Sequence, residues 1–278
     1  MYSKAKIMEY MQKIIDSEDE YNAYVLIAMP LRDNTPPAQN VIEQAYMSVD
    51  FQGYSTGYID IVGETIDVAR NYLMEYALTS GAKYLLFMGE DTIMPFDGFL
   101  RLHETAEANP GSVVSGVYYA KYSSPIVRVL IDKWIVPADV TPGKIIKAHD
   151  SGMDAMLIPI DVLRKLKELE PELPFCAIYN APNIEYGGTY MIGEDYYFCH
   201  RLRDAGIDLI VNTDVQCLHM ELETGKYTAH PDVDLRNYQT RIPIADRLVL
   251  SDKDRLDKSW IDRYPPLPHL IDRVDLVK

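Results

Sequence analysis

Two acidic pairs occur where an α/β protein would carry out chemistry. Glu90 and Asp91 follow the apolar run Tyr84–Met88, and Glu194 and Asp195 open a helical segment. An apolar run without alternation is typical of a strand buried on both faces, and open α/β sheets bind ligands beyond the carboxyl ends of such strands. Carboxylate oxygens there suit Mg²⁺ or Mn²⁺, and a divalent ion can hold a diphosphate. The simpler alternatives are a solvated strand-end turn for the first pair and helix capping for the second.

Residues of two further segments could complete such a site. His219 follows the apolar segment Val215–Leu218, and a neutral imidazole nitrogen is a good third ligand for a transition metal. Arg70 and Asn71 lie in a helical segment, and an arginine beside a phosphate site can pair with a diphosphate. The simpler alternatives are a structural histidine and an arginine on a solvated helix face.

The segments that would position these residues alternate between strand and helix. The predicted strands are Ala23–Pro30, Tyr84–Met88, Ser112–Tyr118, Ala155–Pro159, Asp208–Asn212 and Val215–Leu218. The predicted helices are Glu64–Ser80, Phe96–Ala108, Val162–Leu169 and Glu194–Ala205. The β-α-β-α-β order that begins at the first strand indicates a parallel sheet in a nucleotide-binding type of α/β domain. The stretch Tyr179–Tyr190 is rich in Gly, Asn, Pro and Tyr, and we predict a loop there.

Composition narrows the class of protein. A chain of 278 residues with 47% apolar and 25% charged residues fits one large α/β domain with an appendage, or two small domains. The net charge of −15 disfavours tight electrostatic binding to nucleic acid. No apolar stretch is long enough to span a bilayer and no secretory signal opens the chain, so we expect a cytoplasmic protein. Cys176, Cys199 and Cys217 lack metal-type spacing and are predicted to be reduced and mostly buried.

The two ends of the chain differ from its middle. Lys4–Ser17 has apolar side chains at helical spacing, which predicts an amphipathic helix that packs on the domain or on a partner subunit in a homo-oligomer. We therefore expect an N-terminal helix in residues 1–20, an α/β domain in residues 21–220 and a C-terminal extension or lid in residues 221–278.

An ordered set of segments carries a family resemblance. The segments read AYVLIAMPLRD, IDVARNYLMEYALTSGAKYLLFMGEDTIMP, SGVYYAK, SGMDAMLIP and GEDYYFCHRLRDAGIDLIVNTDVQCLHM. Together they resemble GT-A fold glycosyltransferases, and more narrowly the phage and bacterial branch of the inverting nucleotide-sugar transferases. The resemblance implies a GT-A (Rossmann-like) mixed, mostly parallel sheet flanked by helices, with a C-terminal extension. It also implies a metal-dependent glycosyltransferase of the hexosyltransferase type (EC 2.4). Such an enzyme moves a sugar from a nucleotide-diphosphate donor, here expected to be a UDP-sugar, to an acceptor hydroxyl with inversion.

The resemblance assigns roles to individual positions. Gly152 and Asp154 match the segment between the metal and acceptor sites, and Gly89 stands where the family has the first Asp of its Asp-x-Asp motif, which leaves open whether Glu90 compensates. The implied roles are nucleotide contacts from Pro30, Arg32, Arg70, Asn71 and Glu90, ligation of Mn²⁺ or Mg²⁺ by Asp91 and His219, and general-base catalysis by Asp195.

Two other functions stay open at this point. A nucleotidyltransferase on a related sheet is disfavoured because Met29–Arg32 has no glycine-rich phosphate loop. The glycine at position 89 keeps open a catalytically silent protein that binds a nucleotide sugar or serves in assembly. The acceptor of a transferase could be a glycan, a protein, or a hydroxymethylated base in phage DNA, in which case the protein would work in the host cytoplasm. Tyrosines of Tyr179–Tyr190 and the segment Glu221–Arg241 could line an acceptor site.

Overall fold

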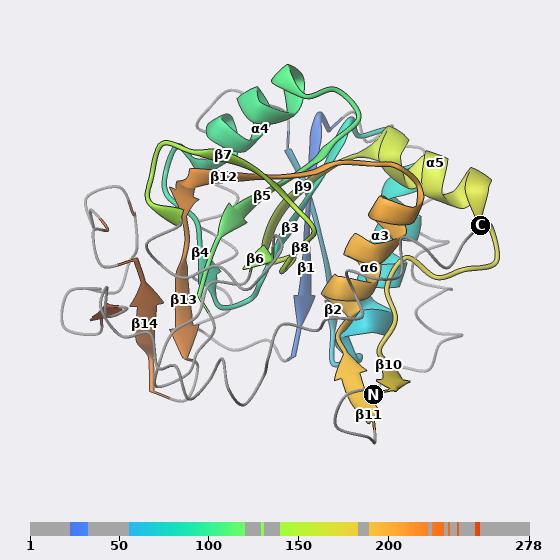
Figure 1. Ribbon diagram of the computed structural model, residues 1–278. Coiled ribbons are helices and arrows are strands. Elements are labelled where there is room, and N and C mark those ends of the chain that lie inside the picture. Colours follow the sequence, from blue (N-terminus) through green and yellow to red (C-terminus); the bar gives the residue numbers. More distant parts are fainter. Residues whose placement is uncertain are drawn as a thin grey trace.

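The computed structural model describes residues 23–32, 56–119, 129–130, 140–182, 189–221, 224–230, 233, 238 and 248–250. The predicted helix at Lys4–Ser17 and the tail beyond residue 250 lie outside these residues. The described part is built around a seven-stranded sheet (Figure 1). In spatial order its strands are β2 (Thr56–Val62), β1 (Val25–Leu31), β3 (Tyr84–Met88), β9 (Ala155–Pro159), β5 (Val113–Val117), β12 (Leu209–Gln216) and β7 (Ile145–Ala148).

The sheet is mixed, with most strands in one direction. β1, β2 and β3 are parallel to one another, and β5 and β12 share their direction. β9 lies antiparallel between β3 and β5, and β7 is antiparallel at the edge. The expected fold class, a mixed and mostly parallel Rossmann-like sheet flanked by helices, is confirmed, and the arrangement is consistent with the GT-A class.

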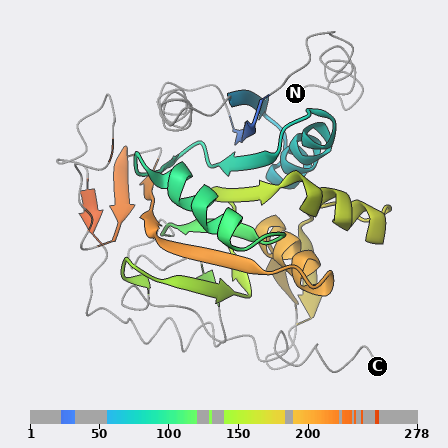
Figure 2. The same cartoon turned by 90° about the horizontal axis from the view of Figure 1, so that it is seen from above.

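Four described helices cover the two faces of the sheet (Figures 1 and 2). α3 (Ile66–Thr79), α5 (Ile160–Leu169) and α6 (Glu194–Asp204) pack on one face, and α4 (Gly98–Ala108) packs on the other. Successive strand residues serve opposite faces: Leu85 lies in the core beneath the three helices, whereas Leu86 lies in the core beneath α4. None of the described helices is long and apolar enough to span a membrane.

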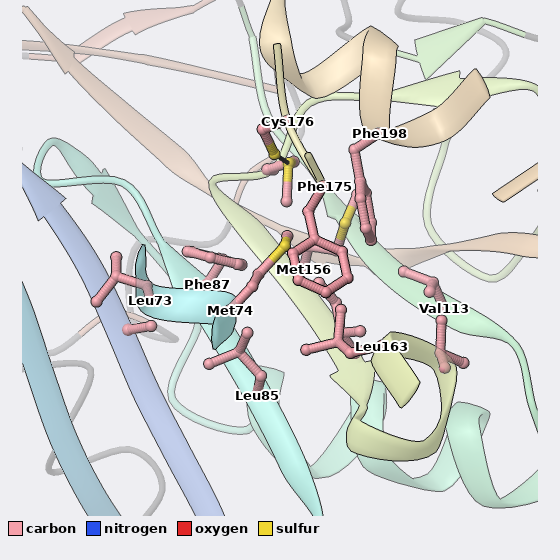
Figure 3. Packing of buried hydrophobic residues seen from close by; sticks show 14 of the residues in the cluster. Leu73, Met74, Leu85, Phe87, Val113, Met156, Leu163, Phe175, Cys176 and Phe198 are labelled. Carbon is pink, nitrogen blue, oxygen red and sulfur yellow. Dashed lines mark hydrogen bonds between the residues drawn. The ribbon is translucent and has the colours of Figure 1, made fainter. Parts of the chain in front are cut away.

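The core beneath the three helices fixes their positions relative to the strands. Figure 3 shows Met74 of α3, Leu163 of α5 and Phe198 of α6 in this core, together with Phe87 of β3 and Met156 of β9. All five side chains are fully buried, and burial of such a side chain stabilises the fold by about 1.5–3 kcal/mol. Residues at the starts of α3 and α6 are therefore held at set positions beside the sheet.

One predicted boundary, one missed strand and one predicted loop need correction. β1 continues past Pro30 to Leu31, because it still pairs there with β2, a strand that the pattern analysis missed. β2 was missed because its sequence, TGYIDIV, contains a glycine and an aspartate and has no continuous apolar run. The predicted loop Tyr179–Tyr190 contains β10 (Tyr179–Pro182) and the start of β11 (Thr189–Ile192), which pair antiparallel. Asn180 and Pro182 have low strand propensity, so the pairing with β11 and not local propensity makes this segment a strand.

A second sheet lies beside the first. Its order is β15 (Leu248–Leu250), β14 (Lys226–Ala229), β13 (Leu218–Glu221) and β4 (Thr92–Ile93), with β13 and β14 at the left of Figure 1. A separate short pair joins β6 (Val129–Leu130) to β8 (Asp150–Ser151). β13 spans the predicted boundary between residues 220 and 221, and residues on both sides of it pair with β14. The division of the chain into a domain and an extension at this point stays a prediction.

Candidate active site

The reversed direction of β9 brings Asp154 to Asp91. β3 and β9 are paired so that Met88, the last residue of β3, lies opposite Ala155, the first residue of β9. The carboxyl end of one strand therefore meets the amino end of the other. The backbone N–H of Gly89 donates to the carbonyl of Asp154 at 3.1 Å. Asp154, which precedes β9, thus lies near Asp91, which follows β3.

The second sheet adds His219 to these acids. β4 begins directly after Asp91, and its Thr92 pairs with His219 of β13. The backbone N–H of Met220 donates to the carbonyl of Asp91 at 2.7 Å, and His219 Nε2 lies 3.3 Å from Asp91 Oδ1. The histidine was predicted to follow a strand Val215–Leu218, but β12 ends at Gln216 and His219 lies within β13.

The three side chains form a group that fits a divalent cation. One ligand atom from each of Asp91, Asp154 and His219 lies within 4.8 Å of the others. Two carboxylates and an imidazole suit Mn²⁺ and also accept Mg²⁺. His219 Nδ1 contacts the carbonyl of Tyr119, and a hydrogen bond from the Nδ1–H leaves Nε2 toward the carboxylates. With Nδ1 engaged by this carbonyl, Nε2 is the ring nitrogen that would ligate a cation beside Asp91 Oδ1.

Asp154 lies so close to Gly89 that any larger residue at position 89 would force atoms of one of the two residues to move. A Cβ on Gly89 would lie 2.8 Å from the Cγ of Asp154. The sequence marked Gly89 as a missing carboxylate, and the structure puts the Asp154 carboxyl group against that glycine. The resemblance assigned Asp154 only to a connecting segment, so its proximity to Asp91 and His219 was missed. The signal available was an acid directly before a fully apolar strand.

Gly152 has a related packing role beside the histidine. A Cβ there would lie 1.5 Å from the hydroxyl oxygen of Tyr118, so the phenol occupies the space of the absent side chain. The Tyr118 ring meets the His219 ring edge-on, with centroids 5.3 Å apart. Gly152 thereby supports the orientation of His219 through Tyr118.

Arg70 connects this group to the second acidic pair. The side chain is only 4% exposed, so the alternative of a solvated helix-face arginine is wrong. Its Nη2 donates to Asp154 Oδ1 at 3.0 Å and its Nη1 donates to Glu194 Oε1 at 2.5 Å. Burial alone would lower the pKa of Arg70, but the charges of Glu194, Asp154 and Asp195 outweigh it and raise the pKa, so the guanidinium stays charged.

The acidic pair of α6 lies in the first turn of the helix. Glu194 is held by Arg70, and Asp195 Oδ1 accepts a hydrogen bond from the N–H of Tyr196 at 2.8 Å. The predicted alternative of helix capping holds in its dipole form, because both acids lie in the first turn, whereas the N-cap residue Gly193 offers no side-chain capping bond. Both carboxylates gain from the positive end of the helix dipole.

The residues predicted to contact a nucleotide differ in exposure and in hydrogen-bond partners. Arg32, at the end of β1, has a side chain that is 77% exposed, and its backbone N–H donates to Glu90 Oε2 at 2.7 Å. Pro30 is buried within β1. Asn71 donates to the carbonyl of Cys176 at 2.7 Å and accepts from its N–H at 3.0 Å, so its carboxamide is engaged with backbone. Their roles toward a nucleotide stay predictions.

One further acid near α6 was not predicted. Asp150 of β8 is 2% exposed, and its Oδ1 lies 3.6 Å from His200 Nε2 and 3.7 Å from a guanidinium nitrogen of Arg203. Burial raises the pKa of Asp150 to about 7, Arg203 lowers it and Asp195 raises it. The three cysteines, predicted to be mostly buried, are all buried free thiols.

Comparisons with known proteins give weak structural similarities and no sequence match. No protein-family model and no curated protein matches the sequence. Among solved structures, A197 from STIV is 17% identical over 71% of this chain and 85% of that chain, with a TM-score of 0.49. GalNAc-T7 with UDP, GalNAc and Mn²⁺ is 9% identical over 72% of this chain, with a TM-score of 0.43, and the match spans only 44% of that protein. At these identities and scores, neither structure assigns a family or an activity to this chain.

Proposed function

We propose that the protein is a metal-dependent glycosyltransferase that moves a sugar from a nucleoside-diphosphate donor, with a UDP-sugar as the first candidate, to an acceptor hydroxyl. The observation that carries this proposal is the group Asp91, Asp154 and His219 at the carboxyl edge of the sheet. Open α/β sheets bind nucleotides at that edge. The link from this group through Arg70 to the acids of α6 adds a carboxylate pair on a second element.

Asp91, Asp154 and His219 would hold Mn²⁺ or Mg²⁺. When bound, such an ion supplies Lewis-acid stabilisation of the negative charge on a diphosphate leaving group. Arg32 follows β1, and its exposed guanidinium pairs with Glu90 through Nε, which lies 3.8 Å from Glu90 Oε1, so its terminal nitrogens could contact a donor phosphate or ribose.

Asp195 is proposed as the general base. Its carboxylate accepts the proton of the acceptor hydroxyl while the hydroxyl oxygen forms a bond to the anomeric carbon of the sugar. The bond from that carbon to the diphosphate breaks, and its electron pair leaves with the nucleoside diphosphate. Attack from the side opposite the leaving group inverts the anomeric configuration. The metal, not a carboxylic acid, would serve the leaving group, which distinguishes this reaction from glycoside hydrolysis by two carboxylates.

The test is a panel of nucleotide sugars incubated with the full-length protein and Mn²⁺, with release of the nucleoside diphosphate as readout. We expect one donor to be hydrolysed, with activity lost in EDTA and in Asp91→Ala. Asp161→Ala is the control, because that acid of α5 is 90% exposed and pairs with Arg164 in its own helix. Hydrolysis that persists in EDTA would exclude the metal role. Calorimetry that shows UDP and Mn²⁺ binding without turnover would identify a silent binding protein.

The acceptor can be sought once the donor is known. Candidates are glycans, protein hydroxyls and duplex DNA that contains hydroxymethylated bases. Transfer of radiolabelled sugar to each class, compared in wild type and Asp195→Asn, would separate true transfer from transfer to water. We expect the Asn variant to bind the donor and to lose transfer by at least about 100-fold.

A further inference from the structure

Two consecutive residues of α3 connect segments that are far apart in the sequence. Arg70 contacts Asp154, which is 84 residues away, and Glu194, which is 124 residues away. Asn71 makes two hydrogen bonds to the backbone of Cys176, 105 residues away. One turn of one helix therefore holds the connection that precedes β9, the start of α6 and the chain that leads into β10.

The hydrogen bonds of Arg70 argue against a direct contact with a ligand. Both terminal nitrogens have carboxylate partners, and the guanidinium carbon lies 6.0 Å from the centre of the Phe87 ring. The Nε of Arg70 is buried and has no hydrogen-bond partner among the described residues. A planar guanidinium can bridge two carboxylates with fixed geometry, which a single ammonium group cannot do.

Asn71 adds a second connection, to the chain that precedes β10. β10 and β11 form a hairpin, and α6 begins two residues after β11. Asn71 holds the chain before this hairpin, and Arg70 holds the helix after it. Both ends of the unit from β10 to the first turn of α6 are thus tied to α3.

We propose that Arg70 and Asn71 are positioning residues that set the first turn of α6, with Asp195, in register with the metal-site carboxylate of Asp154. This inference rests on the proposed function for the roles of Asp195 and Asp154. It replaces the expectation that both residues contact the nucleotide. Reaction between a donor held by one group and an acceptor activated by the other depends strongly on their separation, because a shift of about 1 Å can lower a rate about 100-fold.

The test uses Arg70→Lys in the full-length protein. Lysine retains the charge and is itself a good phosphate ligand, but it cannot bridge Asp154 and Glu194. We expect the affinities for Mn²⁺ and for UDP with Mn²⁺, measured by calorimetry, to stay within about threefold of wild type. At saturating donor, kcat should fall at least about tenfold with little change in KM. A parallel fall in UDP affinity would overturn the inference in favour of a direct diphosphate contact, and an unchanged kcat would overturn it outright.

A second measurement keeps the test independent of activity. Hydrogen exchange of the peptide that spans residues 189–198 should speed up at least about tenfold in Arg70→Lys, and Glu194→Gln should produce a smaller change in the same peptide. The double variant should be no faster than Arg70→Lys alone, because both changes break one connection. Unchanged exchange in both single variants would overturn the inference, even if no donor is ever turned over. If exchange speeds up while no nucleotide sugar reacts, the inference about positioning stands and the proposed function fails.

Arg101→Lys is the matched control. Arg101 of α4 also has two carboxylate partners, Asp97 at 2.6 Å and Asp214 at 3.3 Å, but it is 40% exposed. If Arg101→Lys changes exchange at residues 189–198 as much as Arg70→Lys does, the effect is general loosening and the inference is overturned.

Discussion

The Asp154 side chain occupies the space that a side chain at Gly89 would need. A Cβ at position 89 would lie 2.8 Å from Asp154 Cγ and 3.0 Å from its Oδ1. The glycine that distinguishes this chain from the family it resembles is therefore a packing requirement of its own site. This relationship predicts a coupling that can be measured.

Gly89→Ala should destabilise the protein by about 1–3 kcal/mol, because the added methyl group collides with a half-buried carboxyl group that is held by Arg70. Asp154→Gly in the same chain should recover part of that loss, since the colliding atoms are removed. Urea denaturation of the two single variants and the double variant measures the coupling. Additive effects in this cycle would contradict the contact.

Asp154→Ala should weaken Mn²⁺ binding at least about tenfold, because it removes one of three clustered ligand side chains. Calorimetry or the electron paramagnetic resonance signal of free Mn²⁺ gives the affinity. Asp161→Ala serves again as the control. If Asp154→Ala binds Mn²⁺ as tightly as the control does, Asp154 is not a ligand.

Asn71→Ala should lower the free energy of unfolding by about 1–3 kcal/mol, because the N–H and the carbonyl of Cys176 lose the carboxamide that satisfies them. The affinity for UDP with Mn²⁺ should be unchanged per folded molecule. A selective loss of UDP affinity with normal stability would instead show that Asn71 contacts the nucleotide.

Asp150→Asn should change stability in a manner that depends on pH. Burial raises the pKa of Asp150 from 3.8 to about 7, so the native state keeps a proton that the unfolded chain releases between those values. The wild type therefore loses stability from this group as the pH rises from about 4 to 7. The neutral Asn variant escapes this loss.

The gain of Asp150→Asn over wild type should be near zero at pH 4 and should reach about 2–4 kcal/mol at pH 8. Thermal or urea unfolding at several pH values measures it, with Asp161→Asn as the control. If the Asn variant becomes less stable than wild type as pH rises, then ion pairing of Asp150 with Arg203 outweighs its burial.

The sequence predicted best what depends on local pattern. Tyr84–Met88 and Ala155–Pro159 have the predicted bounds, because strands covered on both faces show as continuous apolar runs. The four predicted helices that fall within the described residues also formed, with ends shifted by a few residues. The half-exposed strand β2 and the hairpin of β10 and β11 were missed, because their pairing partners decide their conformation.

The site was only partly accessible from the sequence for the same reason. Asp91 and His219 were singled out, and they lie within 3.3 Å of each other. The proximity of Asp154 depends on the reversed direction of β9, and the burial of Arg70 depends on an acid 124 residues away. The position of Asp154 before an apolar strand indicates a strand-end acid but not its neighbours, and the local sequence around Arg70 does not indicate its burial between two acids.

The β3–β9 ladder also links the metal group to the mechanical integrity of the protein. Asp91 follows β3 and Asp154 precedes β9, and these strands are paired along their whole length in the middle of the sheet. Local fraying at an edge of the sheet can leave the two acids together, but separation of its centre must pull them apart. A cation bound by both acids would therefore stabilise the centre of the sheet against opening. It would slow proteolysis that requires this opening more than it would slow local motions at the surface.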